Sequence, residues 1–373
     1  MSEQDTTDVI IIGAGFAGCC AAWVLTSQGI SVRMIERTRR YPEAFRAEKI
    51  EPDQAENLRK FGMLDMRLPF AGPLGKTINH RGGISREFDT VEQYGMHYTD
   101  TVNSFRDHLE GRCETVIGRA TEIINSDDLQ TVKTEDGEYR ARVVIVAAGG
   151  KDNLLNPLGI HRRTQDSLTS MSFAFHVEPD DISRFDFSGF NYFLDEPVDD
   201  IDYVTIFRIG DIMRVNLFSQ MSTKSPVLRA IKKSPREQMQ KYFPDLEGLV
   251  GGYTVTTKVQ SYPTNFYRLR GTDVPGVVII GDDYQSVNPT TGTGISKCTT
   301  DADRLCNHYI PQWLKTPGMS ADKIRDYYRD EVKRAVDANS LELWISYRDQ
   351  HRGFWGNKLS SLELRFNNLF DRW

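Results

Sequence analysis

A glycine-rich turn near the start of the chain is the feature that most constrains the fold. The segment Gly13–Gly18 reads Gly-Ala-Gly-Phe-Ala-Gly, follows the β-branched run Asp8–Ile12 and precedes a helical stretch that reaches Leu25. A second apolar run then begins at Ile30 and ends at Glu36. This order of strand, tight turn, helix and strand predicts a βαβ unit, and therefore an α/β fold.

The spacing of the glycines suits the binding of a dinucleotide in a Rossmann-type domain. Gly13 permits the tight turn, Gly15 lets the backbone approach a pyrophosphate, and Gly18 allows close helix–strand packing. The helix N-terminus favours the anion, and Glu36 can accept hydrogen bonds from an adenosine ribose. The motif alone does not separate NAD from FAD. The residues expected to bind this part of the cofactor are Gly13, Gly15, Phe16, Ala17, Gly18, Glu36 and Arg37.

A second glycine-rich segment lies far along the chain, directly after the apolar run Val277–Ile280. Asp282 can accept a hydrogen bond from a ribityl hydroxyl, and the glycines that open the following helix can bring backbone amides to a flavin and its pyrophosphate. Because one nicotinamide dinucleotide would not need two such segments, the predicted cofactor is FAD. The residues expected to bind it here are Gly281, Asp282, Pro289, Gly292, Thr293, Gly294 and Ile295.

Taken together, these motifs resemble the flavoprotein aromatic hydroxylases of the para-hydroxybenzoate hydroxylase type. The order Gly-Asp, Pro and Gly-x-Gly is kept from Gly281 to Gly294, and Arg46 stands where the family has an arginine that contacts FAD. The likeness is good over residues 8–65 and 275–305. It implies an FAD-dependent monooxygenase that uses O2 and a peroxyflavin to hydroxylate a small, aromatic substrate, with NADH or NADPH as a possible reductant.

The source of electrons is left open by three departures from that family's pattern. The third strand ends in Ala147-Ala148-Gly149-Gly150 without the usual aspartate, Gln285 replaces a usual histidine, and a typical helix arginine near Asn103 is absent. Alternatives are therefore an FAD-dependent oxidase or dehydrogenase that takes hydride from its substrate, and a two-component monooxygenase supplied by a flavin reductase. A flavin-binding protein without turnover is a further alternative.

Local patterns predict several elements outside the two glycine-rich segments. Helical spacing indicates helices over Pro52–Phe61 and Tyr98–Leu109, and Asp136-Gly137 indicates a hairpin. Two apolar runs on either side of Gly210-Asp211 indicate a second hairpin. The chain is expected to be helical from Ser320 onwards, with a final helix that carries Leu359, Leu362, Phe366, Leu369 and Phe370.

These elements predict a Rossmann-type FAD-binding domain with an inserted, mostly antiparallel β-sheet domain and C-terminal helices. The FAD-binding domain is expected to comprise residues 1–70, 96–170 and 263–318. Residues 71–95 and 171–262 are expected to form the substrate-binding domain, and residues 319–373 the C-terminal helical segment.

The catalytic groups are not identified by any motif, so the candidates rest on residue type alone. Arg208 and Arg214 could hold a substrate carboxylate or phenolate, and Lys297 could stabilise a reduced flavin or face solvent. Tyr262, together with His97 and His176, could transfer a proton. Candidate walls of the substrate pocket, each more often core than contact, are Phe173, Phe175, Phe193, Phe207 and Phe218.

Composition limits the remaining classes. The 373-residue chain has a net charge of −6, which gives no basis for a nucleic-acid partner. Its five cysteines show no CxxC spacing, so neither a metal site nor a disulfide framework is expected, and the cytoplasm is the expected compartment. No stretch approaches the roughly 20 apolar residues of a transmembrane helix. The C-terminal helices could form a homodimer contact.

Overall fold

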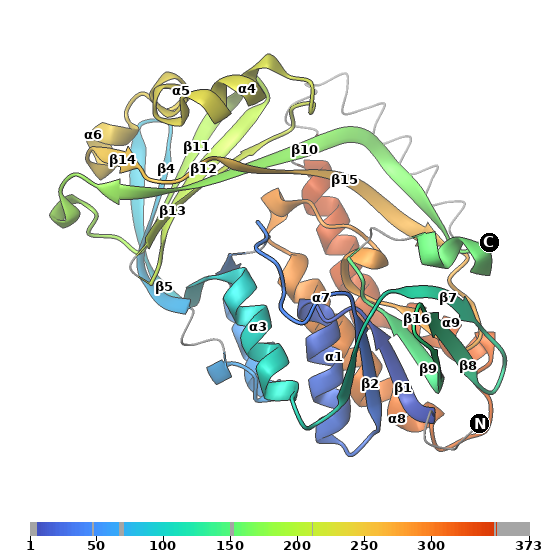
Figure 1. The fold of residues 1–373 in the computed structure, drawn as a ribbon. Helices are drawn as coiled ribbons and strands as arrows, with labels where there is room; N and C mark the ends of the chain where they lie inside the picture. Colours follow the sequence, from blue (N-terminus) through green and yellow to red (C-terminus); the bar gives the residue numbers. More distant parts are fainter. Residues whose placement is uncertain are drawn as a thin grey trace.

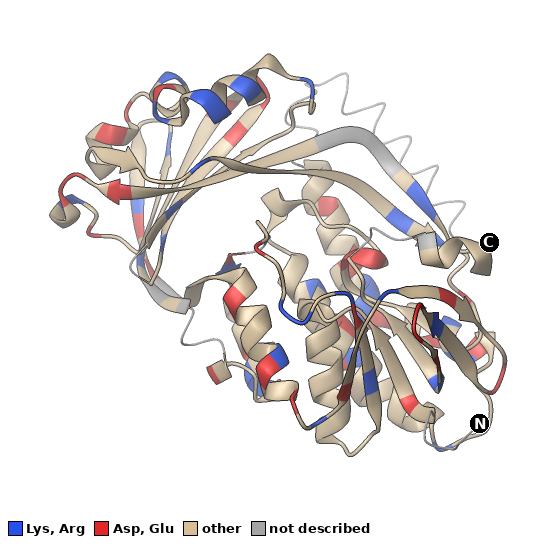
Figure 2. Ribbon diagram, viewed as in Figure 1, with Lys and Arg blue, Asp and Glu red and all other residues tan. Residues whose placement is uncertain are grey.

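The computed structural model describes residues 6–46, 48–66, 71–149, 153–210, 212–346 and 348. Two β-sheets form the framework, with helices packed on the first sheet below and on the outer face of the second sheet above (Figure 1). Lysines and arginines are interspersed with aspartates and glutamates over both units (Figure 2). The predicted α/β class with an inserted, largely antiparallel sheet is confirmed.

The first sheet has the strand order β6-β2-β1-β9-β8-β7, with β16 added beside β9. The pairs β1–β2, β1–β9, β2–β6 and β9–β16 are parallel, whereas β7, β8 and β9 are joined in antiparallel fashion. The antiparallel edge contains the predicted Asp136-Gly137 hairpin. The strands are β1 (Thr6–Ile12), β2 (Val32–Glu36), β6 (Glu114–Ile117), β7 (Ala120–Ile124), β8 (Gln130–Thr134), β9 (Glu138–Val146) and β16 (Val277–Ile279).

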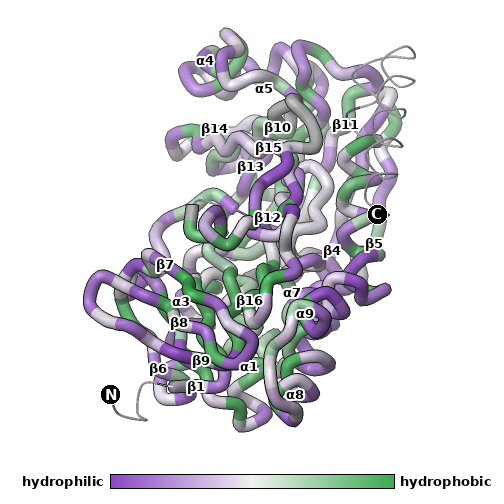
Figure 3. The backbone as a smooth tube through the Cα atoms, turned by 90° about the vertical axis from the view of Figure 1, so that its right-hand side faces the viewer, coloured by the Kyte–Doolittle hydropathy of each residue, from purple (hydrophilic) through white to green (hydrophobic). Residues whose placement is uncertain are grey.

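Burial on both faces explains why the central strands are continuous apolar runs. Residues 9–11 and 143–145 are completely buried, as expected for parallel strands covered by helices. The tube in Figure 3 shows hydrophobic residues gathered along β16 and α1, inside this unit. The covering helices include α1 (Phe16–Ser27), α2 (Pro52–Phe61), α3 (Tyr98–Leu109) and α7 (Gly294–Asp303), and the predicted bounds of α2 and α3 are confirmed.

The second sheet has the order β14-β10-β13-β12-β11-β4-β5-β3, with β15 beside β10. Its pairs are antiparallel except β4–β11, and β12 and β13 form the predicted hairpin. The strands are β3 (Lys49–Ile50), β4 (Ala71–Arg81), β5 (Ile84–Met96), β10 (His161–Pro179), β11 (Gly189–Val198), β12 (Ile201–Ile209), β13 (Ile212–Ser219), β14 (Tyr253–Val255) and β15 (Gln260–Arg270).

Side-chain alternation gives this sheet two different faces. One face packs into a second hydrophobic core with the short helices above it, and Phe173 and Phe175 belong to that core. The other face looks down toward the first unit, so it becomes one wall of the space between the units (Figure 1). The covering helices are α4 (Pro226–Lys233), α5 (Pro235–Tyr242) and α6 (Leu246–Val250).

Two long strands, β10 and β15, run from one unit into the other (Figure 1). They are continuous through positions 170/171 and 262/263, where the sequence analysis drew domain boundaries. The residues 49–50 of β3, assigned there to the FAD-binding part, pair with β5 in the second sheet. The domain boundaries predicted from the sequence therefore stay a prediction, which a test of whether each unit folds on its own would check.

The C-terminal part of the described chain covers the first sheet. The helix α7 leads through a π-helical turn over Arg304–Tyr309 into α8 (Ile310–Trp313) and α9 (Ala321–Tyr328), and residues 331–346 are again helical. The final helix expected from Leu359 to Phe370 lies outside the described residues. Within the described ranges, no helix is both long enough and apolar enough to cross a bilayer.

Candidate cofactor and substrate site

The first glycine turn is pressed against the end of β9. Gly13 has a φ of +102°, and a Cβ atom there would lie 2.4 Å from the carbonyl oxygen of Ala147. A Cβ at Gly18 would lie 2.0 Å from the carbonyl oxygen of Gly13. Both glycines are therefore required by close backbone approach, and Gly18 lets the helix pack against the turn itself.

Gly15 differs from its neighbours because its missing side chain faces open space. The nearest atom to a Cβ there would be a ring carbon of Tyr41, 3.9 Å away. Beside it, the Glu36 carboxylate accepts hydrogen bonds from the backbone N–H groups of Ala14 at 2.7 Å and Arg37 at 2.8 Å. A carboxylate has about four acceptor positions, so Glu36 keeps capacity for a further donor such as a ribose hydroxyl.

Arg106, on α3, is a residue of this site that the sequence analysis missed, since it lies three residues after Asn103, near which no helix arginine was expected. Its guanidinium lies 3.1 Å from the Glu36 carboxylate and donates hydrogen bonds to the carbonyl oxygens of Ala14 at 2.7 Å and Thr38 at 2.8 Å. One turn earlier, Asn103 hydrogen-bonds both backbone groups of Tyr41. An asparagine and an arginine three positions apart on one face of the helix were the available signal.

The second glycine-rich segment begins where β16 ends. The Gly281 N–H donates to the Asp301 carboxylate at 2.8 Å, and the Asp283 carboxylate accepts from the Gly149 N–H at 2.9 Å. Asp283 thereby holds the end of the third predicted strand. A Cβ at Gly292 or Gly294 would meet no atom within 4 Å, so this loop presents bare backbone to open space.

Two large cavities border these segments. The first, about 770 Å³, is lined by Gly13, Gly15, Phe16, Ala17, Glu36 and Arg37, and the second, about 630 Å³, by Pro289, Gly292, Thr293 and Gly294. We call them the cofactor cavity and the substrate cavity. They share five lining residues and so lie next to each other. The shared residues are Phe45, Arg46, Gly149, Tyr262 and Asp282.

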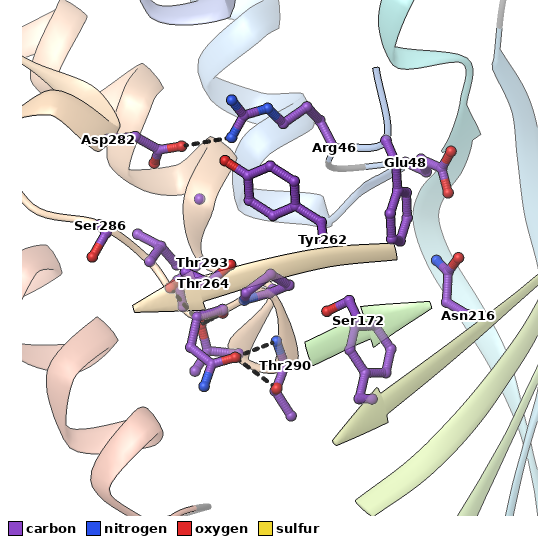
Figure 4. A pocket seen from close by; sticks show the side chains of 18 of the residues that line it. Arg46, Glu48, Ser172, Asn216, Tyr262, Thr264, Asp282, Ser286, Thr290 and Thr293 are labelled. Atoms are coloured by element: carbon purple, nitrogen blue, oxygen red, sulfur yellow. Dashed lines mark hydrogen bonds and ion pairs between the residues drawn. The ribbon is translucent and has the colours of Figure 1, made fainter. Parts of the chain in front are cut away.

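Arg46 and Asp282 mark the junction of the two cavities. Their charged groups lie 3.7 Å apart, and the Arg46 guanidinium stacks over the Tyr262 ring at 4.7 Å. Figure 4 shows Arg46 and Tyr262 between Asp282 on one side and Glu48 on the other. The pair thus connects the loop after β2 with the second glycine-rich segment, as a residue set that contacts FAD should.

The residues present fit FAD. Bare backbone at Gly15, Gly292 and Gly294 faces the open space, and one acidic side chain stands beside each glycine-rich segment, Glu36 and Asp282. Most residues predicted to bind the cofactor line one of the cavities. The three that are not among the described lining residues are Gly18, Gly281 and Ile295.

The sheet forms an aromatic floor in the substrate cavity. Phe193, Tyr203 and Phe218 come from three neighbouring strands and stack in a row, with ring centroids 5.1 Å and 4.7 Å apart. Phe207 lines the same cavity. The expectation that Phe173 or Phe175 forms a pocket wall is wrong, because strand alternation turns both into the core on the far face.

Several polar groups beside the aromatic row are buried without a protein partner. Among the residues that the structure describes, Ser172 Oγ, Asn216 Oδ1, Thr264 Oγ1 and Asn288 Nδ2 have no hydrogen-bond partner and line the substrate cavity. A buried polar atom left unpaired costs about 1–3 kcal/mol. This set therefore points to a ligand, or ordered water, that supplies both donors and acceptors.

Arg214 is not available to clamp a substrate carboxylate. It is 4% exposed, and two of its nitrogens each lie 2.8 Å from the Glu48 carboxylate. It also contacts His176 Nε2 at 2.7 Å and donates to the Gln260 side chain at 3.0 Å. Burial, and then the charge of Arg214, lower the pKa of His176 to about 4. Each of the three guanidinium nitrogens thus already has a protein partner.

The expectation that Lys297 faces solvent is wrong, and its stabilisation of a reduced flavin stays a prediction. Lys297 is fully buried, pairs with Asp337 and lies 3.4 Å from Asp301. Lys333 completes this buried charge cluster, at 2.8 Å from Asp301 and 3.0 Å from Asp337. Lys297 therefore neither faces solvent nor stands among the described residues that line the cavities.

The remaining candidates fall on different surfaces. Tyr262 lies at the junction of the two cavities, whereas Arg208 is exposed on the β12–β13 hairpin and donates to the Gly210 carbonyl oxygen. A third, smaller cavity of about 290 Å³ is lined by His97, His176, Arg214 and Glu48. Among the described lining residues, only Glu48 borders both this cavity and the substrate cavity.

Comparison with known proteins agrees with this geometry. The family model described as FAD binding domain matches residues 6–338. The chain is 24% identical to digeranylgeranylglycerophospholipid reductase 2 of Methanococcoides burtonii, over 98% of this chain and 89% of that protein. It is 23% identical to squalene epoxidase erg1 of Schizosaccharomyces pombe, over 83% and 70%.

Solved structures share the fold. The flavin-dependent brominase Bmp2 superposes with a TM-score of 0.73 at 16% identity, covering 97% of this chain and 92% of the brominase. The p-nitrophenol 4-monooxygenase PnpA from Pseudomonas putida DLL-E4 superposes with a TM-score of 0.68 at 19% identity, covering 98% of each chain. The family match confirms FAD as the cofactor. The chain belongs to the FAD-binding-domain family of flavoproteins related to the aromatic hydroxylases, and it is an FAD-dependent oxidoreductase.

Proposed function

We propose that this protein is a monooxygenase that inserts one atom of O2 into a small aromatic substrate. The observation that carries the proposal is the stacked row Phe193, Tyr203 and Phe218, which faces a cavity adjacent to the cofactor cavity. A flat ring can pack against this row in an offset or edge-to-face arrangement. The name of the similar p-nitrophenol 4-monooxygenase supports a phenol-like ring.

The chain's own residues bind, orient and exclude water. Gly15, Glu36 and Arg46 would hold FAD from one side, and Asp282 with the bare backbone at Gly292 and Gly294 from the other. When bound and reduced, FAD supplies the electrons and activates O2. The aromatic floor then keeps the substrate in a dry space beside the cofactor, which limits loss of the activated oxygen to water.

The electron source is a separate part of the proposal. NADH or NADPH is the reductant that the resemblance implies, although the end of β9 lacks the family's aspartate and is tied instead to Asp283. A flavin reductase that supplies reduced flavin is the second possibility. The similarity to a reductase also supports the alternative of an oxidase or dehydrogenase that takes hydride from its substrate.

The test is anaerobic reduction of the FAD-loaded protein, followed by ¹⁸O2. NADH, NADPH, reduced free flavin and a panel of substituted phenols and anilines are added separately, and bleaching of the flavin absorbance is followed. We expect pyridine nucleotide or reduced free flavin, and not the ring compound alone, to reduce the cofactor. Readmission of ¹⁸O2 should then label a ring compound. Rapid reduction by a ring compound alone would instead support the oxidase or dehydrogenase.

Compartment and assembly complete the proposal. All five cysteines are free thiols, three of them buried, which suits a reducing cytoplasm. A homodimer through the C-terminal helices stays an expectation from the sequence. Sedimentation of the FAD-loaded protein tests it, because a single species at the mass of one chain would contradict a stable dimer.

A further inference from the structure

Glu48 is the acidic side chain that meets the floor of the substrate cavity. It precedes β3, lies 10% exposed, and receives both a two-point contact from Arg214 and a hydrogen bond from the Asn216 amide. Arg214 approaches from the third cavity and not from the substrate cavity. Glu48 thus lines the substrate cavity, where Figure 4 shows it beside Asn216, whereas Arg214 is among the described lining residues of the third cavity only.

The surroundings of Glu48 offer little to an anionic ligand. Apart from Lys49 on β3 and Arg162 on β10, the described residues with which the sheet lines this cavity are uncharged, among them Ser172, Asn191, Thr205 and Asn216. Of the cations that line it, Arg46 faces Asp282 at the junction and Lys49 pairs with Glu51 at 3.0 Å. Arg162 lies exposed beside the Tyr267 ring.

The neutral polar side chains near Glu48 suit an aromatic ring that carries a hydrogen-bond donor. Thr205 pairs in register with Asn191 on one side and Asn216 on the other, one row away from the stacked aromatic rings. A ring lying on Phe193, Tyr203 and Phe218 would thus have its substituent at the polar row and Glu48. Asn216 Oδ1 and Ser172 Oγ lack partners there within the described structure.

We propose that Glu48 sets the substrate class, accepting a hydrogen bond from an O–H or N–H group on the ring and excluding arene carboxylates. This inference rests on the proposed function. A carboxylate close to Glu48 would meet a like charge in a poorly solvated space, whereas a phenol or an arylamine would satisfy the acceptors without adding negative charge. Selection of this kind works by repulsion as well as by attraction.

The test compares phenol, aniline and benzoate, which share the ring and differ in the head group. Equilibrium dialysis of each against the FAD-loaded protein gives three dissociation constants. We expect phenol and aniline to bind at least about tenfold more tightly than benzoate. In Glu48→Gln the buried Arg214 loses its countercharge. The affinity for benzoate should therefore rise and the affinity for phenol should fall, so that the order of the three affinities comes close to reversing.

Two variants serve as controls. Glu51→Gln removes the same charge from the same cavity, where Glu51 and Lys49 are 31% and 30% exposed, and should keep the order of the three rings because water screens that pair. Glu48→Asp keeps the carboxylate. This variant should bind phenol and aniline severalfold more weakly and should still exclude benzoate. If Glu48→Gln does not retain FAD, the Glu48→Asp result tests the role of Glu48 in its place.

The outcomes separate this inference from the function on which it rests. Binding of benzoate to the unaltered protein as tightly as phenol or aniline would overturn the role of Glu48 and leave an aromatic substrate intact. An unchanged order in a Glu48→Gln protein that holds FAD would do the same. Failure of all three rings to bind would count against the proposed aromatic substrate itself.

Discussion

The three glycines of the first glycine-rich turn are required for different reasons, although the motif has the same residue at each position. Gly13 and Gly18 lack room for a Cβ because backbone atoms lie 2.4 Å and 2.0 Å from its position. Gly15 has room, and that room is the cofactor cavity. The fold therefore requires glycine at positions 13 and 18, whereas the cofactor requires it at position 15.

We expect Gly15→Val to abolish FAD binding while the chain still folds. The valine methyl groups would enter the space where the backbone must approach the pyrophosphate. FAD per chain, measured after gel filtration, should fall to a few per cent, with the far-ultraviolet circular dichroism unchanged. Gly18→Val is the matched comparison, since it should reduce folded yield as well. A folded Gly15→Val protein with full FAD content would contradict the assignment.

The protonation of Glu48 gives a prediction that needs no substitution. Burial raises the pKa of Glu48 to about 7, although Arg214 opposes this shift. Below that pH the carboxyl is neutral and leaves Arg214 uncompensated, so benzoate should bind about tenfold more tightly at pH 6 than at pH 8. Phenol stays neutral over this range, and its affinity should follow the opposite, shallower trend.

Other groups around Glu48 must be separated from that effect. Arg214 on β13 and His176 on β10 face it, and Glu43, His97 and Lys258 line the third cavity behind it. The pKa of His176, lowered to about 4, takes its titration out of the range. His97→Asn should leave the pH dependence of benzoate binding in place, whereas Glu48→Gln should remove it.

The contrast between Gly15 and Arg214 shows what the sequence could establish at this scale. The glycine turn is encoded within one strand–turn–helix unit, so its geometry and its ligand could be predicted from neighbouring residues. The partner of Arg214 is Glu48, which is 166 positions away, and the partner of Lys297 is Asp337, 40 positions away. Local pattern cannot reveal such pairings, and both arginine and lysine were therefore misplaced.

At the scale of the element, α3 is more than cover for the first sheet. Through Arg106 it holds the Glu36 carboxylate and the carbonyl oxygens of Ala14 and Thr38. The helix bounds were predicted from apolar spacing, but the polar residues between the apolar ones carry the contact with the glycine turn. Helical periodicity predicts the helix but does not predict its contact with the glycine turn.

We expect Arg106→Met to weaken FAD binding by at least about tenfold and to lower the free energy of unfolding by about 2–3 kcal/mol. The loss leaves Glu36 without its cation and removes the arginine donors of two carbonyl groups, those of Ala14 and Thr38. Fluorescence titration of the apoprotein with FAD and urea unfolding measure the two effects. Arg112→Met, which removes an exposed arginine stacked on Trp23, should change either value little. Equal effects of the two variants would argue against the role of Arg106.

The second sheet offers a prediction that separates its two faces. Phe173→Ala should lower the free energy of unfolding by about 3–5 kcal/mol and leave phenol affinity unchanged, because the ring is in the core. Phe218→Ala should cost less stability and weaken phenol binding severalfold, because the ring is part of the cavity floor. Urea unfolding and equilibrium dialysis provide both numbers. The reverse pattern would show that the faces have been misassigned.

At the scale of the whole molecule, the buried charge cluster joins distant parts of the chain to the second glycine-rich segment. Asp301 on α7 accepts the Gly281 N–H and also pairs with Lys333, which lies on the helical stretch 331–346. The described C-terminal helices thus support the second glycine-rich segment, and none of their described residues is among those that line the cofactor cavity. Their apolar spacing could be predicted, but the charges at its centre could not.

We expect Lys333→Met to lower the free energy of unfolding by about 3–5 kcal/mol, since it leaves an excess negative charge buried with Asp301 and Asp337. The double variant Lys333→Met/Asp337→Leu restores the balance of charge and should recover much of that loss. Urea unfolding of the FAD-loaded protein measures both. A double variant no more stable than the single one would contradict a charge-balance role for the cluster.

The alternation of side chains on β11, β12 and β13 has a consequence for redesign of the enzyme. Positions 193, 203 and 218 belong to the cavity floor, while their neighbours at 192, 204 and 217 hold the core on the opposite face. A combinatorial library confined to the cavity-facing positions would vary the shape and polarity presented to a ligand while sparing the packing beneath. The same sheet could thereby be adapted to rings of different outline with the catalytic cofactor left in place.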